Sequence, residues 1–346
     1  MKAFRVGTNP ETGKAINKIV PYGTDHLEKV SGKWIPVSVS DVSILADAVV
    51  RKCIEIPCGK CVGCRLEYSR QWANRCMLEL QYHQSAYFLT LTYDDCHVPY
   101  SYFGRLDTGE AEKVLTLRKR DLQLFFKRLR KRFSDCKIRY FACGEYGETT
   151  MRPHYHAIVY GLVLDDLVFA RRSKTGNNLY YSQSLQDVWS VIEDDGSRIP
   201  LGFAAVAEVN WETCAYTARY VMKKHMGDDA VFYDLHNIEP DFVVMSRRPG
   251  IGRQYYDDHP DMFVREKISI STPSGGRSFL PPKYYERLYE NDCPEHLAEI
   301  KRARREFATA RSEYILSQTD LFPEEYFSVQ EDVLKARIKS LTRTLL

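Results

Sequence analysis

The chain has 346 residues, of which 44% are hydrophobic and 27% are charged, and its formal net charge is +3. These proportions are typical of a soluble globular protein and predict one large domain with additions, or two domains. The small net charge excludes a uniformly basic surface, so any basic surface must be local. We find no signal peptide and no apolar run long enough to span a bilayer. Ten cysteines in such a chain favour reduced thiols or metal ligands over disulfides, and the expected compartment is the cytoplasm.

Short strands and turns are expected over residues 1–50, followed by a cysteine-rich stretch. Further along, aromatic and β-branched runs predict strands, and apolar residues at helical spacing predict helices. In chain order we expect a helix over 67–82, a strand over 87–93, a helix with the apolar stripe Leu122, Phe125, Phe126, Leu129 and Phe133, strands over 137–143 and 154–160, a helix over 184–192, a strand over 203–209, a helix over 212–225, and charged helical stretches near 282–318 and 324–344.

The central order of these elements is β-α-β-β-α-β followed by a helix. This order predicts an α+β fold with the split βαβ, ferredoxin-like arrangement on an antiparallel sheet, in which the third strand is central. We accordingly divide the chain into an N-terminal region with a cysteine-rich cluster (1–86), a core (87–230) and a loop-rich and helical C-terminal region (231–346).

His154 and His156 open the expected strand over 154–160. Because side chains alternate along a strand, both imidazoles point to one face and make half of a divalent-metal site. If the second and third strands form a hairpin, Glu145 lies beside His154, and Glu148 is the reserve ligand. Two imidazoles with a carboxylate suit Mg²⁺ or Mn²⁺ acting on phosphate oxygens, and the histidines would also tolerate Zn²⁺. The alternative is that Glu145 is a polar turn residue.

The expected helix over 212–225 carries Tyr216 and Tyr220 one turn apart. Helical spacing groups them with Lys223 and Lys224, opposite an apolar side made of Trp211, Ala215, Ala218 and Met222. Isolated tyrosines on a helix are usually packing residues, but this pair is predicted to avoid the apolar side. Phenols beside cations are the layout expected of nucleophiles, because a nearby metal or ammonium favours the phenolate.

The helix with the Leu/Phe stripe is strongly basic on its other side. A solvated face is the ordinary interpretation of such charges, whereas the bias to one sign favours contact with a phosphate backbone. The basic residues on or beside this helix are Arg118, Lys119, Arg120, Lys127, Arg128, Arg130, Lys131 and Arg132.

These motifs together resemble the HUH endonucleases. They comprise histidine-hydrophobic-histidine on a strand, a glutamate just upstream, and two tyrosines four residues apart with lysines on a later helix. Within that superfamily, the chain is similar to the rolling-circle replication initiation proteins of microviruses, which are small single-stranded DNA phages. The two tyrosines and the cysteine-rich lead-in point to the gokushovirus branch. The resemblance covers roughly residues 53–290; it includes the strand motif over 88–92 and a further shared segment over 245–252 that has no assigned chemical role.

The resemblance implies a metal-dependent enzyme that nicks and religates single-stranded origin DNA. One tyrosine would attack the scissile phosphate, leaving a 5′-phosphotyrosine link and a 3′-hydroxyl that primes replication. The second tyrosine would cleave the regenerated origin, so that a single-stranded circle is closed. The implied partners are single-stranded or supercoiled origin DNA and a host helicase and DNA polymerase in the host bacterial cytoplasm. The implied residues are His154, His156 and Glu145 for the metal, Tyr216 and Tyr220 as nucleophiles, and Lys223 and Lys224 to balance phosphate charge.

Two other classes of function remain open at this point. One is another HUH enzyme, such as a plasmid Rep, a relaxase or a transposase. The other is a non-catalytic, zinc-stabilised protein that binds single-stranded nucleic acid, in which the tyrosines only stack on bases.

Cys58, Cys61 and Cys64 are each separated by two residues, a spacing at which three thiols can converge on one ion. A fourth thiol from Cys53 or Cys76 would complete a structural zinc site. An iron–sulfur cluster is an alternative, although the ferredoxin continuation is absent, and reduced thiols in a tight turn are another.

Overall fold

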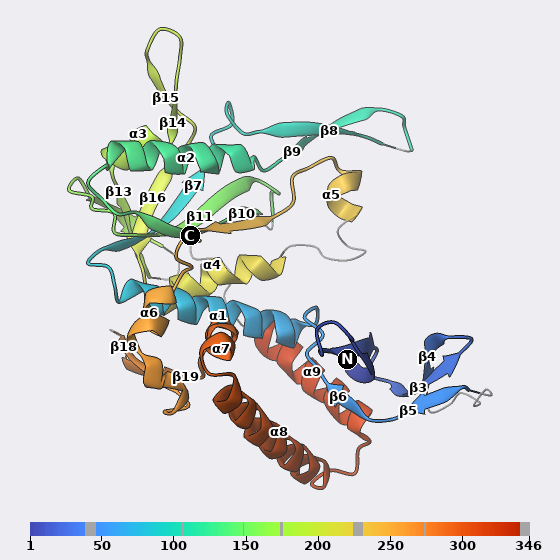
Figure 1. Cartoon of the computed structure of the whole chain (residues 1–346). Helices are drawn as coiled ribbons and strands as arrows, with labels where there is room; N and C mark the ends of the chain where they lie inside the picture. The colour runs from blue at the N-terminus through green and yellow to red at the C-terminus, as the bar shows by residue number, and fades with distance from the viewer. Residues whose placement is uncertain are drawn as a thin grey trace. The chain divides into compact units, whose positions relative to one another are not determined.

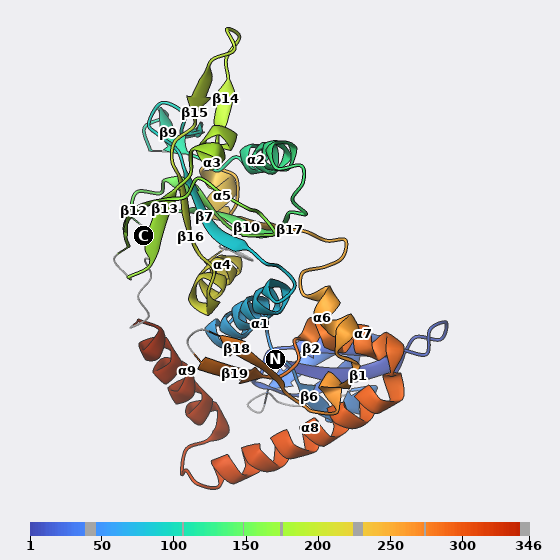
Figure 2. The same cartoon turned by 90° about the vertical axis from the view of Figure 1, so that its left-hand side faces the viewer.

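The computed structural model describes residues 1–38, 46–105, 107–147, 149–173, 176–223, 231–272 and 275–339. The chain divides into two compact units. One combines Met1–Arg65 with Thr309–Ile338, and the bulk of the other is Leu66–Ala308. Figures 1 and 2 show the elements of both units from two directions.

The first unit is built from two three-stranded antiparallel sheets and a helix. The sheets have the orders β2-β1-β6 and β4-β3-β5. A small core of Phe4, Val20 and Leu27 is buried within the unit. The prediction of short strands over 1–50 is confirmed in the described part of that range. The elements are β1 (Lys2–Thr8), β2 (Ala15–Val20), β3 (Thr24–Val30), β4 (Lys33–Ser38), β5 (Ala48–Val50), β6 (Cys53–Glu55) and α9 (Pro323–Lys339).

The second unit is organised around a seven-stranded antiparallel sheet of order β12-β13-β16-β7-β11-β10-β17. Its inner part, β16-β7-β11-β10, has the strand order of the split βαβ arrangement, so the predicted α+β fold is confirmed. The third strand, β11, lies between two neighbours as expected. The strands are β7 (Ala86–Thr92), β10 (Arg139–Tyr146), β11 (Pro153–Tyr160), β12 (Val168–Arg172), β13 (Asn178–Tyr181), β16 (Ala204–Glu208) and β17 (Phe242–Met245).

Several predicted boundaries are wrong. The helix expected over 67–82 begins earlier, as α1 (Val62–Leu80). The helix expected over 184–192 ends at Val188, because the chain then turns into a β-hairpin formed by β14 (Ser190–Ile192) and β15 (Arg198–Pro200). The charged stretch near 282–318 is two helices, α7 (Lys283–Asp292) and α8 (Pro294–Leu316). Proline has no N–H to continue α7 but fits the first position of α8.

The remaining elements of this unit connect or cover the sheet. They are the hairpin of β8 (Tyr100–Gly104) and β9 (Ala111–Leu115), the hairpin of β18 (Ile268–Thr272) and β19 (Gly275–Phe279), a 3₁₀-helix (Pro260–Phe263), and the helices α2 (Lys119–Arg132), α3 (Gln183–Val188), α4 (Trp211–Lys223), α5 (Val231–Leu235) and α6 (Arg253–Asp258).

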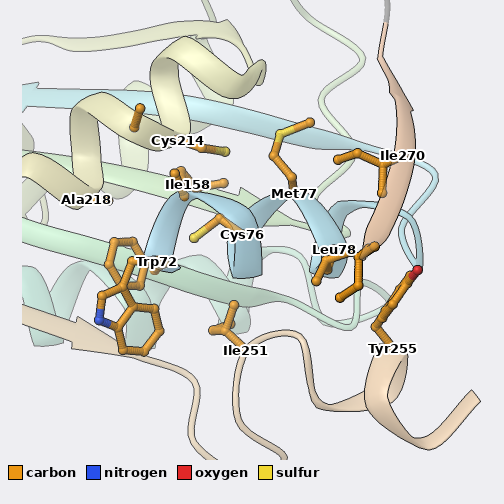
Figure 3. Close-up of a cluster of buried hydrophobic side chains, with 14 of the residues drawn as sticks. Trp72, Cys76, Met77, Leu78, Ile158, Cys214, Ala218, Ile251, Tyr255 and Ile270 are labelled. Carbon is orange, nitrogen blue, oxygen red and sulfur yellow. The ribbon is translucent and has the colours of Figure 1, made fainter. Parts of the chain in front are cut away.

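Helices cover both faces of the sheet: α2 lies on one face, and α4 and α1 lie on the other (Figures 1 and 2). The predicted apolar stripe of α2 is buried at Leu122, Phe125, Phe126 and Leu129. Alternation along β11 divides its residues between two cores. Tyr155, Ala157 and Val159 join the core under α2. Ile158 and Tyr160 join the core under α1 and α4, where Cys76 of α1 and Cys214 of α4 lie near Ile158 (Figure 3).

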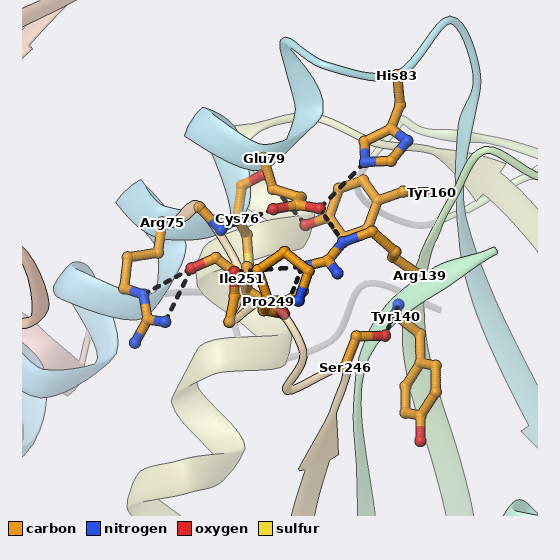
Figure 4. A network of polar contacts seen from close by, with 12 residues as sticks. Arg75, Cys76, Glu79, His83, Arg139, Tyr140, Tyr160, Ser246, Pro249 and Ile251 are labelled. Atoms are coloured by element: carbon orange, nitrogen blue, oxygen red, sulfur yellow. Dashed lines mark hydrogen bonds and ion pairs between the residues drawn. The ribbon is translucent and has the colours of Figure 1, made fainter. Parts of the chain in front are cut away.

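The segment over 246–252 packs on α1 through a buried polar network (Figure 4). Glu79 of α1 accepts a hydrogen bond from the backbone N–H of Gly252 at 2.7 Å and forms an ion pair with Arg139 of β10. The Arg139 guanidinium also donates to the carbonyl oxygen of Pro249 at 2.9 Å. Arg75 donates to the carbonyl oxygen of Ile251 at 2.8 and 3.1 Å. This shared segment therefore has a structural role, which is to fasten the chain after β17 to α1.

Candidate metal and nucleophile site

The hairpin of β10 and β11 places three candidate ligands together. Glu145 is directly opposite His154 in the strand register, as the hairpin prediction required, and His156 follows two residues later on the same face. The Glu145 Oε1 atom lies 2.7 Å from His154 Nε2 and 3.1 Å from His156 Nε2. One ligand atom from each residue lies within 4.8 Å of the others, which is close enough for all three to hold one ion.

The ring orientations of both histidines are fixed by neighbours. His154 Nδ1 lies 3.0 Å from the carbonyl oxygen of Arg152, and because a carbonyl oxygen only accepts, Nδ1 carries a proton. The Nε2 of a neutral His154 ring then has a lone pair that faces the Glu145 carboxylate. Two acceptors at hydrogen-bond distance require a cation between them, either a proton or a metal ion. Histidines that bind metals commonly donate their other N–H in this way.

His156 is fully buried, and its Nδ1 atom lies 3.0 Å from the Thr90 hydroxyl on β7. Its ring stacks on Phe88, with ring centroids 5.4 Å apart. The sequence reasoning did not identify Thr90 as a site residue. The signal was present, because Phe88 and Thr90 lie two residues apart on a strand and therefore share a face.

Glu145 is 1% exposed. Burial raises the pKa of its carboxyl, but the interactions with His154 and His156 outweigh this effect and lower that pKa to about 2. The group is therefore a carboxylate at neutral pH. A buried carboxylate facing two imidazole nitrogens is a donor set that suits a divalent metal.

Tyr216 lies next to this group, on α4. Its ring centroid is 5.1 Å from that of His156, and the two rings are nearly perpendicular. The prediction that Tyr216 avoids the core is wrong, since the residue is 7% exposed and belongs to the core under α1 and α4. α4 is buried on all sides from Thr213 to Ala218 because it lies between the sheet and α1.

Several predicted site residues cannot be placed against this geometry. α4 carries Tyr220 and Lys223 in its backbone, but their side chains are outside the described part of the chain. Glu148 and Lys224 lie outside the described residues altogether. The roles predicted for these four residues therefore stay predictions.

The basic residues of α2 lie on the opposite face of the sheet from the histidines. Seven of them are exposed: Arg118, Lys119, Arg120, Lys127, Arg130, Lys131 and Arg132. Arg128 is half-buried, and its Nε atom donates to the carbonyl oxygen of Val188 at 2.8 Å. The basic face of α2 is therefore not part of the site around Glu145, and its contact with a phosphate backbone stays a prediction.

The three central cysteines of the N-terminal cluster do converge. The sulfur atoms of Cys58, Cys61 and Cys64 lie within 4.8 Å of one another. The predicted fourth thiol is not found in this group. Cys53 packs against the core of the first unit, whereas Cys76 lies twelve residues after Cys64 on α1, about 18 Å along a helix, and is fully buried (Figure 3).

Comparisons with known proteins agree with the resemblance. A family model for replication-associated proteins of the ORF2 type matches residues 86–225. The chain is 32% identical to replication-associated protein ORF2 of Spiroplasma virus 4, over 84% of this chain and 85% of that protein. It is 29% identical to replication-associated protein VP4 of Bdellovibrio phage phiMH2K, over 74% of this chain and 75% of that protein.

A further relative is replication-associated protein ORF4 of Chlamydia phage 1, which is 29% identical over 49% of this chain and 38% of its own length. No solved structure matches the chain. None of the helices in the described ranges combines the length and the apolar composition that crossing a bilayer requires. The chain therefore belongs to the family of replication-associated proteins of these viruses, and its predicted membership among microvirus replication proteins is confirmed.

Proposed function

We propose that the protein initiates rolling-circle replication by nicking single-stranded DNA at the phage origin with a tyrosine, and later religates the strand into a circle. The observation that carries this proposal is the position of the Tyr216 ring, 5.1 Å from His156 within the group of Glu145, His154 and His156. A phenol beside a divalent-metal site is the arrangement that attack on a phosphodiester requires.

Glu145, His154 and His156 are the residues that would hold the metal, for which Mg²⁺ or Mn²⁺ are the candidates. Their donor atoms fit a divalent cation because the lone pair of a neutral His154 Nε2 faces the Glu145 carboxylate at 2.7 Å. Such an ion supplies a Lewis acid that polarises the oxygens of the scissile phosphate.

The protein's own groups would carry out the transfer. The phenol oxygen of Tyr216 or Tyr220 forms a bond to phosphorus as it loses its proton, and the bond from phosphorus to the 3′-oxygen breaks. That oxygen takes up a proton and becomes the 3′-hydroxyl that primes synthesis. The reverse transfer joins the ends, with the second tyrosine making the second cut. Lys223 and Lys224 would balance the phosphate charge.

The test is formation of a covalent adduct between the protein and labelled single-stranded origin DNA in the presence of Mn²⁺ or Mg²⁺. We expect the wild-type protein to form an adduct that survives denaturing electrophoresis, and the double variant Tyr216→Phe/Tyr220→Phe to form none. Tyr181→Phe, at an exposed tyrosine on β13, is the matched control and should react normally. An adduct in the double variant, or none in the wild type, would overturn the proposal. The single Phe variants show which tyrosine makes the first cut.

We further propose that Cys58, Cys61 and Cys64 hold a structural zinc ion. The support is the convergence of three sulfur atoms within 4.8 Å. Elemental analysis of the purified protein should find zinc, and Cys58→Ser and Cys61→Ser should each remove it, whereas Cys136→Ser, a control in the second unit, should not. Iron in place of zinc would favour a cluster instead.

The working partners in this scheme are origin DNA, a host helicase and a host DNA polymerase, met in the host bacterial cytoplasm. Purification of the initiator with nicked origin DNA, followed by addition of each host protein, would test whether the primed strand is unwound and extended.

A further inference from the structure

The hairpin of β8 and β9 has one packed face and one exposed face. On the packed face, the Phe103 ring lies 4.9 Å from the His236 ring, and Asn237 donates to the Ser101 hydroxyl at 2.9 Å. The strand register places Tyr100 and Tyr102 on the other face. They are 50% and 53% exposed, so the hairpin presents two large rings to solvent (Figure 1).

Positive charge accompanies these rings. Lys113 is directly opposite Tyr102 in the register, and its ammonium group lies 4.0 Å from the centroid of the Tyr100 ring. At the tip, Arg105 is paired with Asp107 and Glu112, so the charge there is balanced. At the root, where the chain enters α2, Arg118, Lys119 and Arg120 are all exposed. The aromatic face therefore runs from a neutral tip to a basic root.

A cavity of about 520 Å³ lies at this root, which is within the usual size range of small-molecule sites. Tyr100 and Arg118 line it, together with Asp234 and Glu239. The two carboxylates disfavour a phosphate inside the cavity, whereas they can accept hydrogen bonds from the amino group of a nucleobase. The cavity thus suits a base whose phosphate stays outside, near Arg118.

The root is also close to the end of the sheet that carries the metal group. The Tyr146 hydroxyl, one residue after Glu145, accepts from the N–H of Leu117 at 2.9 Å and donates to the carbonyl oxygen of Glu239 at 2.6 Å. Leu117 and Glu239 both line the cavity. A strand held on the hairpin would therefore be led to the sheet end at which Glu145 lies.

We propose that the exposed face of the β8–β9 hairpin holds single-stranded DNA, with Tyr100 and Tyr102 stacked on unpaired bases and with Lys113 and Arg118 at phosphates. Exposed aromatic rings interleaved with cations are the arrangement that binds single strands without sequence preference. That the partner is DNA rests on the proposed function; the surface itself does not depend on which tyrosine nicks, or on whether nicking occurs.

The test is the affinity of the full chain for a fluorescein-labelled oligothymidylate, measured by fluorescence anisotropy in EDTA so that no metal-dependent chemistry takes place. Stacking predicts that Tyr100→Ala and Tyr102→Ala each weaken binding roughly tenfold, and that the double variant weakens it by up to about a hundredfold. Tyr100→Phe/Tyr102→Phe keeps both rings and should bind as the wild type does. Tyr314→Ala removes a 66% exposed tyrosine from α8 and is the matched control.

A second probe separates stacking from charge. An oligonucleotide with abasic sites keeps its phosphates, so the wild type and the double Ala variant should bind it equally. Equal affinities of these two proteins for the normal oligonucleotide, or an equal loss on both probes, would overturn the proposal, as would a loss explained by a lowered melting temperature. A wild type that forms no covalent adduct would refute nicking alone, because binding in EDTA is measured independently.

Discussion

The network around Glu79 allows a test of how the segment over 246–252 is held. We consider Glu79→Gln, which keeps the shape of the side chain but removes its charge. The side chain is 5% exposed and that of its partner Arg139 is 18% exposed. Glu79 also accepts from Gly252 N–H at 2.7 Å and interacts with His83 Nε2 at 3.1 Å. Glutamine has one acceptor oxygen in place of two, and its NH₂ group would face donors.

The expected magnitude follows from these contacts. Loss of a charge-assisted hydrogen bond costs about 1.5–3 kcal/mol, and a buried donor left without a partner costs about 1–3 kcal/mol. Because Arg75 independently binds Ile251 at 2.8 and 3.1 Å, the segment keeps part of its attachment, and we expect a loss of about 3 kcal/mol. For a unit of this size, about 2–4 °C is lost per kcal/mol, so the melting temperature should fall by about 6–12 °C.

The assay combines thermal unfolding with hydrogen exchange resolved by mass spectrometry. Faster exchange should be concentrated in the segment over 246–252 and in the facing part of α1. Asp257→Asn is the control: it breaks a pair with Arg253 whose side chains are 49% and 37% exposed, and it should cost less than about 1 kcal/mol. A Glu79→Gln melting temperature within the range of this control, or unchanged exchange over 246–252, would refute the reasoning.

The same variant predicts a pH dependence. Burial raises the pKa of Glu79, but the interactions with His83, Arg139 and the Gly252 N–H outweigh it and lower that pKa below the ordinary value of 4.5. A carboxyl whose pKa is lowered on folding contributes stability that is fully present above its unfolded pKa and is lost as the pH falls through the folded one. The stability difference between wild type and Glu79→Gln should therefore shrink below about pH 4.5. A difference that grew with acid would contradict this assignment.

Three further changes test the fold and the site. Gly202→Ala should cost at least about 3 kcal/mol in urea unfolding, because the φ of Gly202 is +155° and a Cβ there would lie 2.2 Å from the Thr92 carbonyl oxygen. Phe125→Ala should cost about 3–5 kcal/mol by the same measurement, since the ring is fully buried under α2. Thr90→Val removes the partner of His156 Nδ1, and calorimetric titration with Mn²⁺ should show affinity reduced about 10–100-fold with the melting temperature kept; unchanged affinity would argue against the proposed ligand set.

The metal group could be predicted from sequence because it depends on short-range geometry. Alternation along one strand aligned His154 with His156, and a hairpin between consecutive strands brought Glu145 opposite them. The four inner strands were predictable for the same reason, since each was a strongly apolar run. Neither inference needed a contact between distant parts of the chain.

Contacts between distant segments account for what was missed. The segment over 246–252 is attached to α1 through Glu79 and Arg75, which precede Gly252 by more than 170 residues. No local periodicity encodes such a pairing. Likewise, the β14–β15 hairpin ends the predicted helix over 184–192 through strand pairing that a helical spacing rule cannot detect.

Tyr216 shows where a periodicity argument ends and tertiary structure begins. A helical wheel separates an apolar side from a polar side, and this separation predicts exposure only when a helix packs on one surface. α4 has two, because the sheet lies on one side and α1 on the other, so the side away from its apolar residues is also covered. The aromatic ring of tyrosine suits such burial, whereas the hydroxyl needs a polar neighbour. The contact with His156 follows from that packing and not from the spacing of the tyrosines, so the same packing that contradicted the predicted exposure places Tyr216 beside the candidate metal group.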